Sequence, residues 1–106
     1  MNERKKLIRG IVLDILFGKE NVQYPPTQFL SLCAGVAAVM ARRNVPASPG
    51  RLPINFSGLS EEDSLFIHEI FWDLIVERVI TIGSDSANLE YPWFRLHSEA
   101  KANSKT

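Results

Sequence analysis

The residues best able to carry catalysis are few and far apart in this 106-residue sequence. There are two histidines, His68 and His97, and one cysteine, Cys33, which lies inside an apolar run. A Cys–His nucleophile pair or a metal centre needs such residues in a recognisable cluster, and the sequence does not suggest one. It also contains no glycine-rich phosphate loop. We therefore expect no enzyme activity, no cofactor and no metal site.

The second chemical feature is a row of carboxylates that recurs at helical spacing. The row consists of Glu62, Glu69, Asp73 and Glu77. General acid–base catalysis would need a partner acid, base or nucleophile beside these carboxylates, and none converges on them in sequence. Aromatic residues flanked by charges are typical of protein interfaces. The candidates for contact with a protein partner are therefore Glu69, Asp73, Trp72 and Trp93.

Positive charge is concentrated in the first half of the chain, although the formal net charge is zero. Eight of the twelve basic residues but only three of the twelve acidic ones lie within residues 1–51. This asymmetry is typical of a surface for nucleic acid or an acidic partner, and equally of two halves that attract each other. The predicted phosphate-contacting residues are Arg42, Arg43, Arg51, Arg95, Lys5 and Lys6. Arginines at a helix end are also favoured by the helix dipole alone.

Two amphipathic or apolar segments predict the first two helices. Apolar residues from Leu7 to Leu16 recur at helical spacing, and Gly18 is placed to end that helix. A second helix is expected from about residue 27 to 43, after two prolines. Because it is apolar nearly all round, it needs cover on more than one side, and we expect a homodimer or a partner contact.

The second half of the chain predicts a loop, a third helix and a hairpin. Residues 44–59 are rich in proline and glycine and indicate a loop, with a short extended piece at 52–56. Ser60 and Asp63 resemble a capping box at the start of the third helix. Residues 79–82 and 91–96 favour two strands joined by a turn over 83–88. Pro92 belongs at the start or exposed edge of the second strand.

Residues 70–97, IFWDLIVERVITIGSDSANLEYPWFRLH, resemble the recognition helix and wing of winged helix-turn-helix domains in bacterial regulators. The resemblance implies an α+β fold of winged-helix type, with three helices followed by a two-stranded antiparallel wing. We expect this domain to span residues 1–98 and residues 99–106 to form a frayed tail. The function that the resemblance implies is DNA binding and transcription regulation.

The sequence departs from the regulators at two places. Val79 occupies the corner between helix and strand where glycine is common, and its branched Cβ resists a positive φ. The third helix presents carboxylates where recognition helices usually present Arg, Lys, Asn or Gln to base edges. The first hypothesis is a regulator that contacts the phosphates of double-stranded DNA. The alternative is a protein-interaction module or accessory subunit of a larger complex, with the fold as an adaptor.

The sequence also predicts the compartment. The longest near-continuous apolar stretch, residues 29–41, suits a buried helix and is too short for a membrane span. No signal peptide is evident. A single cysteine in an apolar run is typical of a buried free thiol, and a reducing cytoplasm is the expected location.

Overall fold

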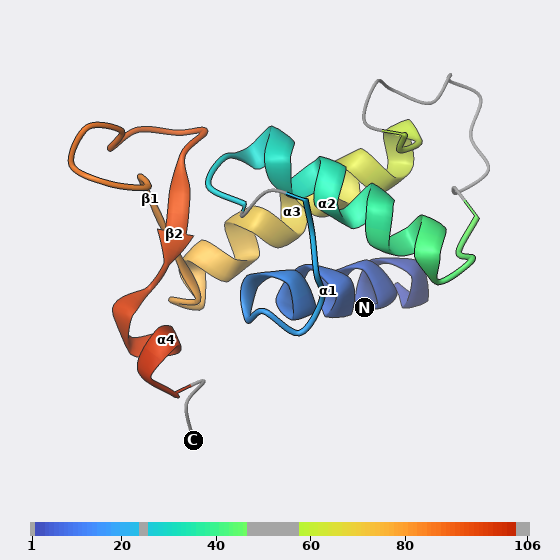
Figure 1. The fold of residues 1–106 in the computed structure, drawn as a ribbon, viewed down its shortest axis with the longest axis horizontal. Coiled ribbons are helices and arrows are strands. Elements are labelled where there is room, and N and C mark those ends of the chain that lie inside the picture. The colour runs from blue at the N-terminus through green and yellow to red at the C-terminus, as the bar shows by residue number, and fades with distance from the viewer. Residues whose placement is uncertain (1, 24–25, 47–57, 104–106) are drawn as a thin grey trace.

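The structure, a computed structural model, describes the backbone of residues 2–23, 26–46 and 58–103, and side chains within these ranges up to residue 100. The elements follow in the order α1 (Glu3–Leu16), α2 (Phe29–Arg42), α3 (Glu61–Val76), β1 (Ile80–Ile82), β2 (Phe94–Leu96) and α4 (Ser98–Asn103) (Figure 1). The fold is α+β with a two-stranded antiparallel sheet, as the sequence predicted. Within the described ranges no helix combines the length and the apolar character needed to cross a membrane.

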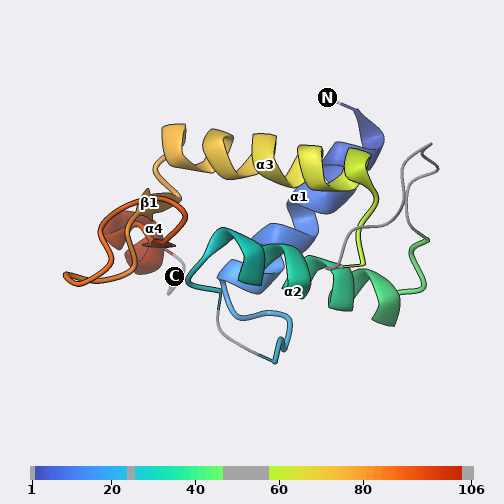
Figure 2. The same ribbon diagram turned by 90° about the horizontal axis from the view of Figure 1, so that it is seen from above.

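The helix α1 begins four residues before the apolar pattern does, because Asn2 caps it. The Asn2 side chain accepts hydrogen bonds from the backbone N–H groups of Arg4 at 2.7 Å and Lys5 at 3.2 Å. One side of α1 is buried, through Ile8, Ile11, Val12, Ile15 and Leu16. This side packs against both α2 and α3, so α1 is the element that joins the other two helices (Figure 2).

The helix α2 buries its larger apolar side chains within the chain itself. They are Leu32, Cys33, Val36, Val39 and Met40. The surface keeps Leu30 together with the small residues Ala34, Ala38 and Ala41. Much of the cover that we expected a second copy to provide therefore comes from the chain's own core, and the homodimer stays a prediction.

The helix α3 starts at the predicted cap. The Ser60 hydroxyl accepts a hydrogen bond from the Asp63 backbone N–H at 3.2 Å, and three acidic residues occupy the first turn, where the helix dipole favours negative charge. Its buried stripe is Ile67, Ile70, Phe71 and Leu74. Together with α1 and α2 this stripe forms the hydrophobic core, to which the hairpin adds Ile80 and Phe94.

The hairpin pairs Ile80 with Leu96 and Ile82 with Phe94 in antiparallel register. It follows directly on the C-terminal end of α3, and Figure 2 shows it beyond that end of the helix. Gly83 ends β1 with a φ of +95°. A Cβ at this position would lie 2.8 Å from the carbonyl oxygen of Leu89, so both the conformation and the space require glycine.

The start of α2 is tied to the second strand of the hairpin. The Phe29 N–H donates to the Pro92 carbonyl and the Phe94 N–H donates to the Thr27 carbonyl, both at 3.0 Å. Pro92 lies two residues before β2, because this strand begins at Phe94 and not at Tyr91 as predicted, and the Tyr91–Pro92 peptide bond is cis. The hairpin is therefore fixed to two helices, to α3 through the chain and to α2 through hydrogen bonds.

The three long helices end in the same way, with a left-handed residue directly after the C-cap. These residues are Gly18, Asn44 and Arg78, with φ values of 75°, 57° and 62°. At the third, the Val79 N–H donates to the Leu74 carbonyl at 2.8 Å, and the Arg78 N–H donates to the Ile75 carbonyl at 3.1 Å. From the sequence, Val79 was the residue at the corner between helix and strand that would resist a positive φ. In the structure the positive φ falls one residue earlier, at Arg78.

Two expectations differ from the structure or lie outside it. We expected no regular structure after residue 98, but α4 occupies Ser98–Asn103. The backbone N–H of Glu99 donates to Nδ1 of His97, near the start of this helix. The extended piece predicted at 52–56 lies outside the described residues.

Candidate interaction surface

Arg42 and Arg43, the centre of the predicted phosphate surface, are engaged by carboxylates of the same chain. Arg42 Nη2 lies 2.8 Å from Glu20 Oε2. Arg43 Nη2 lies 2.6 Å from Glu20 Oε1 and 3.0 Å from Asp14 Oδ2. The hydrogen bond between Arg43 and Glu20 raises the pKa of Arg43 and holds the pKa of Glu20 below its ordinary value. The end of α2 is therefore a charge-compensated surface.

Lys5 and Arg9 of α1 are paired with the carboxylate row of α3. Lys5 Nζ lies 2.9 Å from Glu69 Oε1 and 3.4 Å from Asp73 Oδ2, and Arg9 Nη2 lies 2.7 Å from Glu77 Oε1. The hydrogen bond with Glu69 is the main cause of the raised pKa of Lys5. The two halves of opposite charge thus attract each other within one chain.

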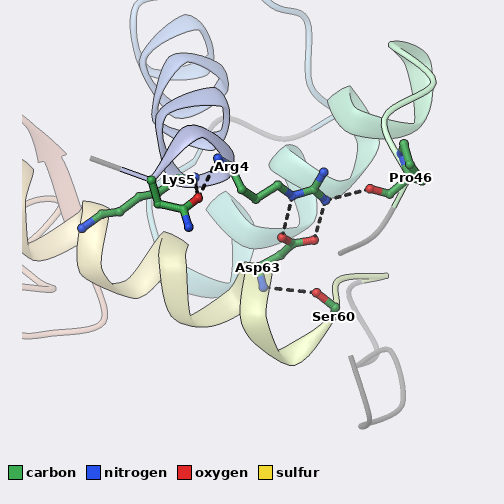
Figure 3. A network of polar contacts seen from close by, with 6 residues as sticks. Arg4, Lys5, Pro46, Ser60 and Asp63 are labelled. Atoms are coloured by element: carbon green, nitrogen blue, oxygen red, sulfur yellow. Dashed lines mark hydrogen bonds and ion pairs between the residues drawn. The ribbon is translucent and has the colours of Figure 1, made fainter. Parts of the chain in front are cut away.

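A further ion pair, between Arg4 and Asp63, lies deeper, at the N-terminal ends of α1 and α3. The Arg4 guanidinium donates through Nε and Nη2 to the two carboxylate oxygens of Asp63, at 3.0 and 2.9 Å, and Nη2 also donates to the Pro46 carbonyl at 2.7 Å (Figure 3). The Asp63 side chain is fully buried. Its hydrogen bond raises the pKa of Arg4. Arg4 therefore holds α1, α3 and the segment after α2 together.

The remaining predicted phosphate contacts lie elsewhere. Lys6 is exposed on α1. Arg95, on β2, donates to the carbonyls of Gly83 at 2.8 Å and Ile82 at 3.3 Å. Arg51 lies outside the described residues. The structure thus brings Arg42 and Arg43 together, but it places Lys5 and Arg95 on different elements.

The outward side of α3 carries a column of apolar and aromatic side chains. Leu65, Trp72 and Val76 are 56%, 40% and 82% exposed. His68 lies between the first two, and its Nε2 accepts a hydrogen bond from Trp72 Nε1 at 3.2 Å. Tyr91, from the hairpin, stacks on Trp72 with ring centroids 5.8 Å apart and an interplanar angle of 21°. We call these five residues the aromatic face.

The predicted partner-binding residues divide between two places. Trp72 belongs to the aromatic face, and Glu69 and Asp73 lie beside it on α3. Trp93 is half-buried in the hairpin and lines a hollow there together with Leu89 and with Tyr91 of the aromatic face. Leu65 and Val76 were not among the partner contacts predicted from the sequence. Their signal was available, because positions i, i+7 and i+11 fall on one side of a helix.

Among the residues that the structure describes, the other reactive groups are not gathered into a second site. Burial raises the pKa of the Cys33 thiol to about 12, which suppresses its thiolate form. Within the described residues no three His, Cys, Asp or Glu side chains are grouped to hold a metal ion. An open hollow of about 550 Å³ lies where α4 approaches the ends of α1 and α3, and Lys19, Glu77, Arg78 and Glu99 give it mixed charge.

Comparison of the chain with protein-family models, with curated proteins and with solved structures finds no match. The chemistry of its surfaces is therefore the basis for any statement about function.

Proposed function

We propose that the chain is a winged-helix protein-interaction module, an adaptor or accessory subunit of a larger complex, which uses α3 and the wing to contact a protein partner. The order of elements, three helices followed by a two-stranded antiparallel hairpin, supports the winged-helix interpretation. A cytoplasmic location remains part of this proposal, and the buried free thiol of Cys33 is compatible with it.

The observation that carries the proposal is that three of the predicted phosphate-binding cations are already paired with carboxylates. Arg42, Arg43 and Lys5 are each bonded to carboxylates of the same chain. To bind a phosphate, each cation would have to leave its carboxylate or share it with a second anion, and the neighbouring carboxylate would repel that anion. This favours the adaptor over the DNA-binding regulator that the sequence placed first.

The outward side of α3 supports the same choice. In a DNA-reading winged helix this side would enter the major groove, where hydrogen-bond donors and acceptors read base edges. Here the column presents Leu65, Trp72 and Val76, with Glu69 and Asp73 alongside. Apolar and aromatic side chains fit a protein surface, whereas the carboxylates repel phosphate.

A titration with random-sequence duplex DNA at several salt concentrations tests the proposal. We expect weak binding, with a shallow dependence of log affinity on log salt concentration. Tight binding with a steep slope that becomes shallower when Arg42 and Arg43 are changed to Ala would support the DNA-binding regulator instead.

A matched pair of variants tests the physical reason. The double variant Asp14→Asn and Glu20→Gln keeps the side-chain shapes but releases both arginines from charged partners. We expect this variant to bind DNA more tightly than the unmodified chain at low salt, and the same variant with Arg42→Ala and Arg43→Ala to lose the gain. Equal DNA affinity in all forms would show that ion pairing does not control this surface.

A further inference from the structure

We propose that the aromatic face binds an amphipathic helix of a partner protein whose apolar side is flanked by Lys and Arg. This inference rests on the proposed function and names the chemistry of the partner. It is supported by the continuity of the column, by the fixed positions of its aromatic rings and by the charge beside it.

The column is continuous along α3. Leu65, His68, Trp72 and Val76 follow one another at spacings of three, four and four residues, so their side chains lie one above the next on the helix surface. With a rise of 1.5 Å per residue the column is about 16 Å long, which matches three turns of a partner helix. A contiguous apolar patch of this kind on a small domain marks an interaction site.

The aromatic rings are held in place before any partner arrives. The Trp72 N–H is already bonded to His68, and the Trp72 ring is stacked on Tyr91. Tyr91 in turn contacts the buried ring of Phe71, with centroids 5.9 Å apart, and the partly buried ring of Phe29, with centroids 6.4 Å apart. Because these exposed rings are positioned by buried ones, a partner loses little conformational entropy by ordering them.

The charge beside the column selects a basic partner. Along one flank lie Glu69, Asp73 and Glu77, whose side chains are about half exposed. Among the described residues they form ion pairs with Lys5 and Arg9, so these three carboxylates and two cations carry one net negative charge. The remaining negative charge and the free oxygen lone pairs favour Lys or Arg on the partner. An acidic helix or a nucleic acid would meet repulsion there.

A second copy of the chain does not offer the same complement. Its Lys5 and Arg9 lie against its own α3, and its Arg42 and Arg43 are held by its own carboxylates. Two aromatic faces brought together would also place two carboxylate rows side by side. The charge pattern therefore favours a different protein.

The inference is tested by a surface-display selection on the full chain. The library consists of random helical peptides of about 14 residues. We expect enriched peptides to carry apolar residues at i, i+3 or i+4, and i+7, flanked by Lys and Arg. Selected peptides should then weaken about 30-fold with Trp72→Ala and about tenfold with Val76→Asp.

The matched control is Leu30→Asp, which introduces the same charge at an exposed aliphatic residue on α2. We expect it to leave peptide affinity unchanged. Val76 is the most exposed of the large apolar side chains described, so Val76→Asp should not unfold the chain, and it keeps the test valid even if Trp72→Ala lowers stability. Unfolding curves of all three variants show whether a loss of peptide affinity comes from a loss of stability.

Three results would overturn the inference and leave the proposed function standing. They are enrichment of acidic peptides, peptide binding that Val76→Asp does not change, and self-association that Val76→Asp abolishes in light scattering. Failure to enrich any peptide overturns the inference as well. If that failure is joined by tight, strongly salt-dependent binding of duplex DNA, the proposed function is overturned with it.

Discussion

On one side of α3, facing α1, carboxylates meet cations of the same chain, whereas on the outward side Trp72 and Tyr91 stack on each other and remain half exposed. The charged side holds the domain together, with Arg4 paired to the fully buried Asp63 at its N-terminal end. The aromatic face contributes apolar area that no described residue covers completely. Charge in this chain therefore holds the elements together, whereas the exposed apolar side chains form the surface that we propose for a partner.

Removing Arg4 should break the charged side most severely. Arg4→Ala takes the guanidinium away from a fully buried carboxylate, and we expect the free energy of unfolding to fall by about 3 kcal/mol. Urea unfolding measures this. Arg9→Ala, which removes a partly exposed pair with Glu77, is the control and should cost no more than about 1 kcal/mol. Equal costs for the two variants would show that burial does not distinguish the pairs.

A substitution in the hairpin turn should disturb the aromatic face and leave the ion pairs of α1 and α3 intact. Gly83→Ala places a Cβ 2.8 Å from the Leu89 carbonyl oxygen in a residue with φ +95°, and we expect a loss of about 2 kcal/mol. Because the hairpin turn also positions Tyr91, amide spectra should change around Trp72 and stay constant in α1. Gly10→Ala is the control, since nothing lies within 4 Å of its Cβ position, and it should leave stability unchanged or raise it slightly. A stable Gly83→Ala variant with unchanged spectra would contradict the described turn.

The C-terminal end of α3, where the chain turns into the hairpin, can be stabilised. Arg78 ends α3 with a φ of 62°, a conformation that costs an L-residue about 1 kcal/mol. We therefore expect Arg78→Gly to raise the free energy of unfolding by up to about 1 kcal/mol, as measured by urea unfolding. Asn44→Gly should have a smaller effect, because asparagine tolerates this conformation. Destabilisation by Arg78→Gly would show that the Arg78 side chain makes a contact worth more than the backbone strain.

The smallest effect concerns pH at the end of α2. Arg43 lowers the pKa of Glu20 in the folded chain, so this pair contributes stability above the unfolded pKa of Glu20, near 4.5, and the contribution disappears as the pH falls below that value. We expect Glu20→Gln to flatten this part of the stability curve, measured by urea unfolding between neutral and acid pH. Arg43→Ala should flatten it similarly, and an unchanged curve in both variants would argue against the pair.

Local patterns predicted most of the fold. The period of the apolar residues indicated α1 and α3, the Ser60 cap marked where α3 begins, and the β-branched and turn residues indicated the hairpin. These signals act over a few residues, so the sequence displays them directly. The left-handed residue at the end of α3 was harder to predict, because an arginine gives no local sign of this conformation. Only the requirement to turn into β1 imposes it on Arg78.

The surfaces were less predictable, because they depend on contacts between distant residues. Arg4 and Asp63 are 59 positions apart, and Arg9 and Glu77 are 68 apart. The charge asymmetry of the two halves allowed either attraction within the chain or a surface for an anionic partner, and only the fold decides which cations meet which carboxylates. The aromatic face likewise needs Tyr91 to return beside Trp72 after the hairpin turn.

The chain contains two tryptophans, and they lie in different surroundings: Trp72 is stacked at the surface of α3, while Trp93 is half-buried in the hairpin. The unmodified protein therefore carries its own optical reporter. A ligand that covers α3 should shift the fluorescence of Trp72, and a Trp93→Phe variant isolates that emission. Occupancy can thus be followed in solution without attaching a dye.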